Sequence, residues 1–316
     1  MDRLNVQPKL PTPVVSATYN EANQMLTFQP EGDTEWQMTY DENGNLTSIT
    51  NSCGTTNFIW DARNRLVGIE GFDEKCNPLS ASFKYDALGR RIEKTINGRT
   101  IQYLYDGLDI VQEIENGMVK TMYVSSIYID EPLASIGTNG IIRFFHADGL
   151  GSIIALTDDA GLIRTQYYYS PFGETELIGE PSDNPFQYTG RENDGTGLYY
   201  YRFRYYSPIL KRFISEDPIR FAGGNNFYVY VDNSPINSID YYGLGHPYRC
   251  NMLKVNCELE CGNKCEEQNE EFELCLYWCN TEGLMYCLGC PGRGKYPPNP
   301  YCKDKKDENP EHKINK

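Results

Sequence analysis

The sequence predicts an all-β fold of stacked hairpins, followed by a small cysteine-rich tail that we expect to be α-helical. Three observations lead to this prediction. A short aromatic–acidic motif recurs every 20–25 residues, Tyr (25 residues) outnumbers Phe (13 residues), and cysteine is concentrated near the end of the 316-residue chain. Tyrosine favours half-buried strands, because its ring packs against the core while its hydroxyl stays hydrated.

The recurring motif joins an aromatic residue to an acid or an amide. It occurs at Tyr19-Asn20, Tyr40-Asp41, Trp60-Asp61, Tyr85-Asp86 and Tyr105-Asp106. Turns rich in Gly and Asn follow, and the flanks alternate with the period of a half-buried strand. The acidic side chain can bond the backbone of the turn just beyond it. A unit of about 20 residues cannot bury a core alone, so the hairpins are expected to pair into one long sheet.

Composition divides the chain into four parts. Residues 1–16 carry no pattern and are expected to be poorly structured, residues 17–139 hold the repeats, residues 140–244 form a denser β-like domain, and residues 245–316 form the cysteine-rich module.

Arg and aromatic residues alternate within residues 201–206. This alternation predicts one strand with Arg202 and Arg204 on one face and Tyr201, Phe203 and Tyr205 on the other.

Charge and motifs exclude several function classes. The chain holds 29 basic and 44 acidic residues, a net charge of −15, which argues against nucleic-acid binding by the body. No apolar run reaches the roughly 18–20 residues of a membrane helix, and the polar start lacks a secretory signal. Nucleotide loops, zinc-protease helices and serine elbows are also missing, so no cofactor and no metal are expected in the body.

The most specific stretch of the sequence lies between residues 210 and 244. It runs through Leu210–Ile219, Gly223–Tyr230 and Asn233–Pro235 to Asp240–Leu244. Residues 143–244 resemble the RHS repeat-associated core domain, and residues 40–106 resemble RHS/YD repeats. Both are found in bacterial Rhs proteins, in the C components of insecticidal toxin complexes and in the YD-shell of teneurins. The resemblance covers about three quarters of the chain.

The resemblance implies a β-sheet wound into a hollow shell, closed by a core domain that cuts its own chain after the final Gly-Leu. It implies that Asp217 and Asp240 act as an aspartic-protease-like pair on the Leu244–Gly245 bond, and we expect Arg212 to orient the pair or compensate its charge. Two neighbouring carboxyl groups share a proton, so the ionised one can activate water while the protonated one donates to the carbonyl oxygen.

Three positions depart from the family pattern. Lys211 and Arg220 stand where the family has Gly, and Tyr241 stands where it has Pro. Both Asp residues and the Gly-Leu are retained. The alternative interpretation makes Asp217 and Asp240 simple turn residues, in which case the chain is no enzyme.

Nine of the eleven cysteines lie in the last 72 residues, a density typical of small disulfide-stapled scaffolds. Within each of two pairs, Cys261 with Cys265 and Cys275 with Cys279, the residues are one helical turn apart. Two antiparallel helices could therefore carry disulfides Cys261–Cys279 and Cys265–Cys275, although spacing does not fix the connectivity.

Zinc is the alternative for the tail. Cys287 and Cys290 have metal-ligand spacing, and Cys302 or Cys250 could complete a site. The Lys- and Pro-rich end, residues 291–316, is expected to be disordered.

The expected function is that of an RHS-type polymorphic toxin fragment, secreted or displayed at a bacterial cell surface, which self-cleaves to release its cysteine-rich effector. Its partners would be its own C-terminal segment as cargo and a protein that completes the shell or directs secretion, because five motifs make a short sheet. The alternative is a non-enzymatic structural or binding module that contacts carbohydrate or protein through its repeats, with the tail as an interaction domain.

Overall fold

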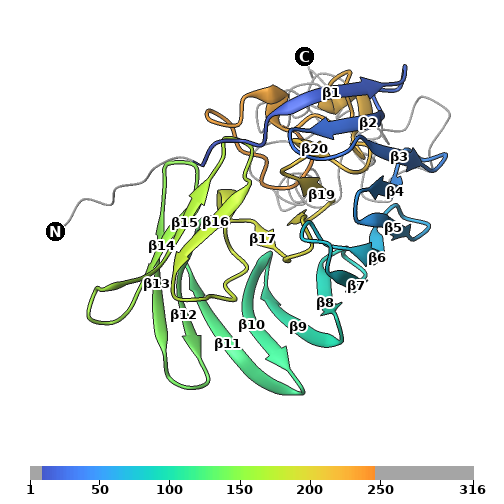
Figure 1. Cartoon of the computed structure of the whole chain (residues 1–316). Helices are drawn as coiled ribbons and strands as arrows, with labels where there is room; N and C mark the ends of the chain where they lie inside the picture. The colour runs from blue at the N-terminus through green and yellow to red at the C-terminus, as the bar shows by residue number, and fades with distance from the viewer. Residues whose placement is uncertain (1–8, 246–316) are drawn as a thin grey trace, which may run out of the picture. The chain divides into compact units, whose positions relative to one another are not determined.

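The computed structural model describes residues 9–245, which form one long sheet curved around a small one (Figure 1). The long sheet has 16 strands in chain order, and every neighbouring pair is antiparallel. The small sheet has four antiparallel strands and lies on the concave side of the long one. The predicted all-β fold is confirmed.

The strands of the long sheet are β1 (Val14–Tyr19), β2 (Met25–Pro30), β3 (Trp36–Tyr40), β4 (Leu46–Asn51), β5 (Gly54–Trp60), β6 (Leu66–Phe72), β7 (Pro78–Tyr85), β8 (Arg91–Ile96), β9 (Arg99–Asp106), β10 (Asp109–Glu115), β11 (Met118–Ser125), β12 (Pro132–Gly137), β13 (Ile142–Ala147), β14 (Ile153–Thr157), β15 (Ile163–Tyr169) and β16 (Thr175–Gly179). The small sheet consists of β17 (Glu192–Asn193), β18 (Tyr199–Tyr201), β19 (Arg204–Ser207) and β20 (Arg212–Phe213). Three short 3-10 helices accompany it: η1 (Tyr188–Gly190), η2 (Arg220–Gly223) and η3 (Val231–Asn233).

The acidic residue of the repeat motif folds the turn that follows it, as the sequence predicted. The Asp41 Oδ1 atom accepts the backbone N–H groups of Asn43 and Asn45 at 2.9 and 2.8 Å. Asp61 and Asp86 bind the residues two and four positions later in the same way. Asp106 differs, because it ends β9 and the chain reverses through only two residues before β10.

The aromatic residue of the motif ties neighbouring hairpins together. Its polar atom donates a hydrogen bond to the carbonyl of the residue that opens a strand of the preceding hairpin. The bonds are Trp60 Nε1 to Leu46 (2.7 Å), Tyr85 Oη to Leu66 (2.6 Å) and Tyr105 Oη to Arg91 (2.8 Å), and Tyr169 Oη repeats the arrangement with Ile153 (2.6 Å). At Trp60-Asp61 and Tyr85-Asp86 the motif thus satisfies one carbonyl and one turn, which explains its near-constant step.

The long sheet continues without a break through residue 140, where the sequence analysis began a new domain. The turn chemistry also continues, since Asp148 and Asp158 accept the N–H groups two and four residues later. Asp148 and Asp158 follow Ala147 and Thr157, so the aromatic half of the motif is missing at these two turns, whereas Tyr169 retains it.

Apolar side chains of the long sheet pack against the small sheet. One cluster joins Phe28, Leu46 and Leu66 to Tyr200 and Tyr205 of the small sheet. A second fills the space under β9–β15, and a third, rich in tyrosine, surrounds β18 and β19. The small sheet therefore fills the concave side of the long sheet, which we call the wall, and its position depends on the curvature of the wall.

A buried ion pair adds to this docking. The Arg91 guanidinium, which opens β8, donates to Glu192 of β17 at 2.6 Å and to both carboxylate oxygens of Asp194. The side chains of Arg91 and Asp194 have no exposed surface.

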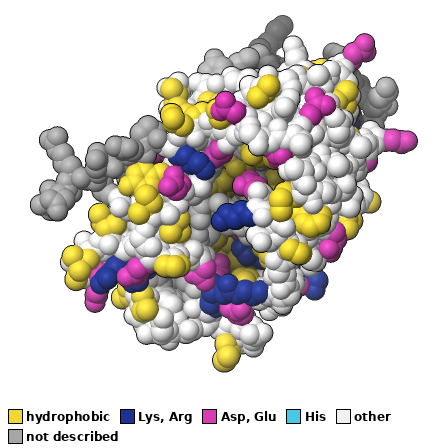
Figure 2. All heavy atoms as spheres, in the orientation of Figure 1, with side chains coloured by type: hydrophobic (Ala, Val, Ile, Leu, Met, Phe, Trp, Pro, Cys, Tyr) yellow, Lys and Arg dark blue, Asp and Glu magenta, His cyan; other side chains and the backbone are white. Residues whose placement is uncertain are grey.

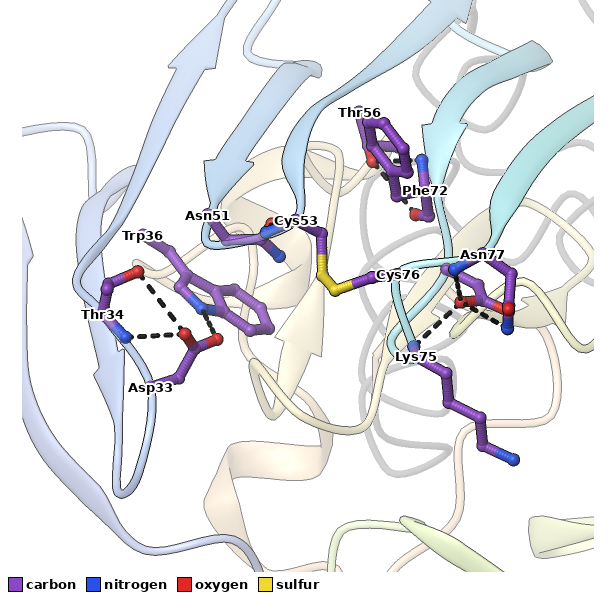
Figure 3. Close-up of a disulfide and its surroundings, with 11 residues drawn as sticks. Asp33, Thr34, Trp36, Asn51, Cys53, Thr56, Phe72, Lys75, Cys76 and Asn77 are labelled. Carbon is purple, nitrogen blue, oxygen red and sulfur yellow. Dashed lines mark hydrogen bonds between the residues drawn. A yellow bond between two sulfur atoms is a disulfide. The ribbon is translucent and has the colours of Figure 1, made fainter.

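Cys53 and Cys76 form a disulfide between two neighbouring turns of the long sheet (Figure 3). Cys53 lies between β4 and β5, Cys76 lies between β6 and β7, and their Cα atoms are 5.0 Å apart. This bond was not predicted, since the two residues belong to different repeats. It gives a covalent link that the repeat pattern does not encode.

The segment before β1 reaches the other end of the sheet. Thr12 donates through its N–H and its hydroxyl to the carboxylate of Glu174, at 2.9 and 2.6 Å, and Lys9 N–H donates to the Tyr169 carbonyl at 3.2 Å. The chain between residues 9 and 13 thereby links the first strand to the hairpin of β15 and β16, although residues 1–16 were expected to be poorly structured.

A cavity of about 700 Å³ is lined by side chains of β8–β11 and by residues 182–195. Figure 2 shows a hollow on the face that is drawn, with Lys and Arg side chains gathered in it. Two of the cations that line the cavity are paired: Lys94 lies 3.1 Å from Asp194, and Lys120 lies 2.7 Å from Glu113.

The chain divides into two units, Met1–Pro247 and Tyr248–Lys316. The predicted disulfides Cys261–Cys279 and Cys265–Cys275, and the zinc alternative, lie outside the described residues. Within residues 9–245, no helix has the length and apolarity that a membrane crossing needs. The same residues contain no group of side chains suited to hold a metal ion.

Candidate functional site

A tight hairpin delivers the first charged group of the site. Tyr201 pairs with Arg204, so β18 and β19 are joined by only Arg202 and Phe203. Arg202 has a φ of 57°, in the left-handed region. The single strand predicted for residues 201–206 is therefore wrong, because the alternation of Arg and aromatic residues fits a two-residue hairpin equally well.

Three consecutive residues of this hairpin hold the segment that follows Asp240. The Arg202 guanidinium donates to the Tyr241 carbonyl, the Phe203 N–H donates to the Tyr242 carbonyl at 3.1 Å, and Arg204 Nε donates to the Gly243 carbonyl. The approach is close enough to require glycine at position 243. Its φ is 72°, and a Cβ atom there would lie 2.4 Å from the Tyr201 carbonyl oxygen.

Arg204 brings the two predicted aspartates together. Its Nη2 atom lies 2.9 Å from Asp217 Oδ2 and 3.6 Å from Asp240 Oδ2. All three side chains are at most 3% exposed. A guanidinium with a charge fixed at all ordinary pH values is well suited to holding two buried carboxyl groups near each other.

Asp240 binds the backbone ahead of it with both oxygens. Its Oδ1 atom accepts the N–H groups of Tyr242, Gly243 and Leu244 at 3.2, 2.8 and 3.0 Å. Its Oδ2 atom accepts the N–H of Gly245 at 2.8 Å. The bonds to the residues two and four positions later repeat the turn chemistry of the repeat motif, and the bond to Gly245 is additional.

Asp217 faces two glycines. A Cβ atom on Gly223 would lie 2.5 Å from Asp217 Oδ2, and one on Gly245 would lie 3.7 Å from the same oxygen. The other carboxylate oxygen accepts the Ile219 N–H at 3.0 Å. Glycine at position 223 thus permits the carboxylate to approach the backbone closely, beside Gly245.

Burial raises the pKa of Asp240, and the charge of Asp217 raises it further, while Arg204 and the N–H groups of Gly245 and Leu244 oppose the shift. The net direction is upward. Burial lowers the pKa of Arg204, although the charges of Asp217 and Asp240 act to raise it. A raised pKa favours the protonated form that a general acid needs, whereas the Gly245 N–H donates to Asp240 Oδ2 in the structure.

The likeness to known proteins agrees with this fold. Residues 74–236 match the family described as Teneurin YD-shell, and residues 40–71 match the family described as RHS Repeat. The chain belongs to the RHS/YD-repeat family. In its structure, Asp217 and Asp240, the two residues that the resemblance implied, both lie beside Arg204.

Two relatives and one solved structure illustrate the range of this family. The tRNA nuclease WapA of Bacillus subtilis is 35% identical over 235 residues, covering 72% of this chain and 10% of that protein. Double-stranded DNA deaminase toxin A of Burkholderia cenocepacia is 30% identical, covering 76% of this chain and 19% of that protein. The Photorhabdus luminescens Tc holotoxin pore superposes with a TM-score of 0.51 at 20% identity, over 73% of this chain and 15% of that one, which shows a shared fold. This RHS/YD-repeat chain therefore spans less than a fifth of either relative's length.

In this RHS/YD-repeat chain, Arg204 holds the place that we expected for Arg212. The Arg212 guanidinium donates to the Asn23 carbonyl at 2.6 Å and lies over the rings of Tyr19 and Tyr228. The sequence offered one signal for Arg204, its position in the densest aromatic segment. The prediction of one continuous strand missed the two-residue turn that directs Arg204 toward the aspartates.

Two of the three departures from the family pattern keep the backbone that glycine would adopt. Lys211 has a φ of 60° and Arg220 a φ of 49°, both in the left-handed region. A residue with a Cβ atom costs on the order of 1–2 kcal/mol there. The third departure, Tyr241, presents the carbonyl that Arg202 binds.

Proposed function

We propose that this chain is the shell-and-core portion of an RHS-type toxin and that Asp217 and Asp240 hydrolyse its own Leu244–Gly245 bond. The observation that carries the proposal is the 2.8 Å hydrogen bond between Asp240 Oδ2 and the Gly245 nitrogen, the atom that would leave. Support also comes from Arg204, which binds the Asp217 carboxylate and holds it close to Gly245.

The reaction is a hydrolysis. The ionised carboxylate of the pair removes a proton from water, and the resulting hydroxide adds to the Leu244 carbonyl carbon. The protonated carboxyl group, which we assign to Asp240, passes its proton to the Gly245 nitrogen. The C–N bond then breaks, giving a carboxylic acid on Leu244 and a free amine on Gly245, and transfer of a proton from the new acid to the amine leaves the carboxylate and the ammonium. One carboxyl group of the pair thus acts as the base and the other as the acid, a division of roles that two carboxyl groups sharing a proton allow.

The pair gains from being buried and fixed. Leu244 is 3% exposed, so the residue before the scissile bond is seated in the protein rather than free in solvent. The N–H groups of Gly243 and Leu244 donate hydrogen bonds to Asp240 Oδ1, which hold the same segment. Because the reacting groups are already oriented in the folded protein, the entropic part of the activation barrier is smaller.

Release of the segment beginning at Gly245 is the role that we assign to the cut. Residues 245–316 lie beyond both family matches and carry nine of the eleven cysteines. The names of the relatives give them unlike activities, a tRNA nuclease and a DNA deaminase, which suits a common shell with different payloads. We propose that the segment is cargo, that a further protein completes the shell or directs export, and that the product acts outside the producing cell.

Intact mass of the expressed full chain tests the proposal. We expect wild-type protein to split into fragments that end at Leu244 and begin at Gly245, whereas Asp240→Asn and Asp217→Asn stay whole. Asp148→Asn is the matched control. Its carboxylate makes the same turn bonds, to Leu150 and Ser152 at 2.9 Å each, but lies in a repeat-like turn.

The control separates catalysis from turn formation. Cleavage of the Asp148→Asn variant together with intact Asp240→Asn assigns the chemistry to the pair. A wild-type chain that stays whole would overturn the proposal, and so would an Asp240→Asn variant that is cut at the wild-type rate.

A further inference from the structure

We propose that Asp130 and Arg202 are positioning residues for this cleavage, through which the wall of the long sheet holds the reactive segment in place. The inference rests on the proposed function and concerns its regulation: the cut would require the loop between β11 and β12 to be docked against the small sheet.

Asp130 is the centre of a buried charge cluster. Its Oδ1 atom lies 2.7 Å from Arg202 Nη2 and its Oδ2 atom lies 2.9 Å from Arg202 Nη1, a two-pronged contact. Arg191 Nη1 also donates to Asp130 Oδ1, at 2.5 Å. The carboxylate is 5% exposed and the two arginines 11% and 3%. Paired bonds of this kind fix the plane of a guanidinium as well as its position.

Arg202 carries this orientation to the site. Its Nη1 atom, held by Asp130, also donates to the carbonyl of Tyr241, the residue directly after Asp240. Arg202 occupies the two-residue turn whose next members, Phe203 and Arg204, bind the following carbonyls. A shift of this guanidinium would therefore move the backbone on which Asp240 is mounted.

The loop that supplies Asp130 fits closely against the small sheet. Gly190 ends η1, and a Cβ atom there would lie 2.5 Å from the Asp130 carbonyl oxygen. Asp130 has a φ of 59°, a conformation that Asp tolerates better than most residues. The close packing of this loop against Gly190 therefore fixes the position of the Asp130 carboxylate.

Asp130 and Arg202 are 72 residues apart in the chain. Their contact requires the loop between β11 and β12 to lie against the small sheet, an arrangement that the curvature of the long sheet provides. The arrangement would delay cutting until the wall is assembled, because an unseated loop leaves Arg202 without its partner.

Two readouts test this inference. In the full chain, Asp130→Asn should slow cleavage on the order of 100-fold, the loss expected from a misplacement of about 1 Å. In the uncut Asp217→Asn background, adding Asp130→Asn should speed hydrogen exchange of the Gly243, Leu244 and Gly245 amides by about tenfold or more.

Asp194→Asn is the matched control. It makes the same substitution in an equally buried carboxylate that also joins the wall to the small sheet, through Arg91. We expect it to lower stability while the folded protein is cut within about twofold of the wild-type rate, since Asp194 shares no direct partner with Asp130 or Arg202 and is connected to them only through Arg91, Glu192 and Arg191. Exchange at residues 243–245 should also stay unchanged.

Chemical rescue covers the case in which Asp130→Asn fails to fold. Arg202→Ala should be cut slowly, and added guanidinium at millimolar concentration should restore much of the rate, which a merely structural loss would not allow. Wild-type cleavage rates for both variants, or unchanged exchange with Asp130→Asn, would overturn the inference. An uncut wild type would instead overturn the proposed function, while the exchange experiment still decides whether Asp130 positions the segment.

Discussion

The Oδ2 atom of Asp240 accepts a hydrogen bond from the amide nitrogen of Gly245 at 2.8 Å. In the repeat turns, the acid uses one oxygen for the backbone, as Asp41 does with Asn43 and Asn45. Asp240 makes these turn bonds with Oδ1 and has a second oxygen available for the peptide ahead. A turn-forming residue of the ordinary kind thus becomes a candidate acid through one additional contact.

Self-cleavage should persist to a higher pH than the ordinary titration of Asp would allow. Burial raises the pKa of Asp240, and the charge of Asp217 adds to the shift. A mechanism in which protonated Asp240 is the acid predicts a rate that falls as pH rises through this raised pKa. The rate can be followed by intact mass after cell-free synthesis in buffers of different pH.

The Asp148→Asn control should give the wild-type pH profile, because its carboxylate lies outside the pair. A rate that instead increases and levels off as pH rises would mean that Asp240 acts in its ionised form, contrary to the assignment.

Replacing Arg204 should stop the reaction, whereas replacing Arg212 should not. Arg204→Gln removes the cation between Asp217 and Asp240, and loss of a partner from a buried charged site costs about 3–5 kcal/mol. Arg212→Gln removes an equally buried guanidinium that bonds Asn23 instead. The fraction cut should be compared in soluble protein that shows the native β-sheet circular dichroism spectrum.

This comparison decides whether Arg204 or Arg212 supports the two aspartates in the cleavage reaction. Loss of cleavage in folded Arg212→Gln, with cleavage retained in Arg204→Gln, would restore the assignment made from sequence.

Much of the fold could be predicted from local chemistry. The spacing of Tyr40, Trp60 and Tyr85 gave the hairpins, because each motif satisfies its own turn and one neighbouring carbonyl. Such bonds depend on residues close in sequence, so the pattern is visible without the structure. The continuation through β16 was harder to see, since only the acidic half of the motif persists at Asp148 and Asp158.

Two of the missed features depend on contacts between residues that are distant in the sequence. Cys53 and Cys76 meet because successive turns lie side by side in the sheet, and Asp130 meets Arg202 because the sheet curves. Arg204 was missed for a local reason: a two-residue hairpin and a continuous strand share the same alternation. The sequence selected both carboxylates only through their resemblance to a family.

The Cys53–Cys76 disulfide should stabilise the sheet under oxidising conditions. It closes a loop of 23 residues, and a loop of this size is expected to contribute about 3 kcal/mol to the free energy of unfolding. The double variant Cys53→Ala/Cys76→Ala should therefore unfold at a lower denaturant concentration than the wild type.

Reduction provides the control for this prediction. A thiol reductant should lower the midpoint of the wild-type body, followed by its tryptophan fluorescence, to that of the double variant. A double variant with the wild-type midpoint under oxidising conditions would show that the hydrogen-bonded turns suffice.

The buried pair of Arg91 and Asp194 should make the docking of the small sheet sensitive to acid. Burial raises the pKa of Asp194, but Arg91 and Lys94 outweigh it, and the net pKa is lowered. A carboxylate with a lowered pKa in the folded state stabilises that state at pH values above its unfolded pKa. The contribution is lost as pH falls through the lower, folded value.

Asp194→Asn should accordingly cost about 3–5 kcal/mol near neutral pH, because it leaves Arg91 buried without its full partner. At acid pH the difference from the wild type should shrink, since the wild-type carboxylate is also being protonated. Denaturant unfolding at several pH values measures this convergence. Lys84→Gln is the surface control: it breaks the ion pair with Glu93, whose lysine is 68% exposed, and should change stability by less than about 1 kcal/mol at any pH. An equal loss for Asp194→Asn at neutral and acid pH would assign its role to packing rather than to charge.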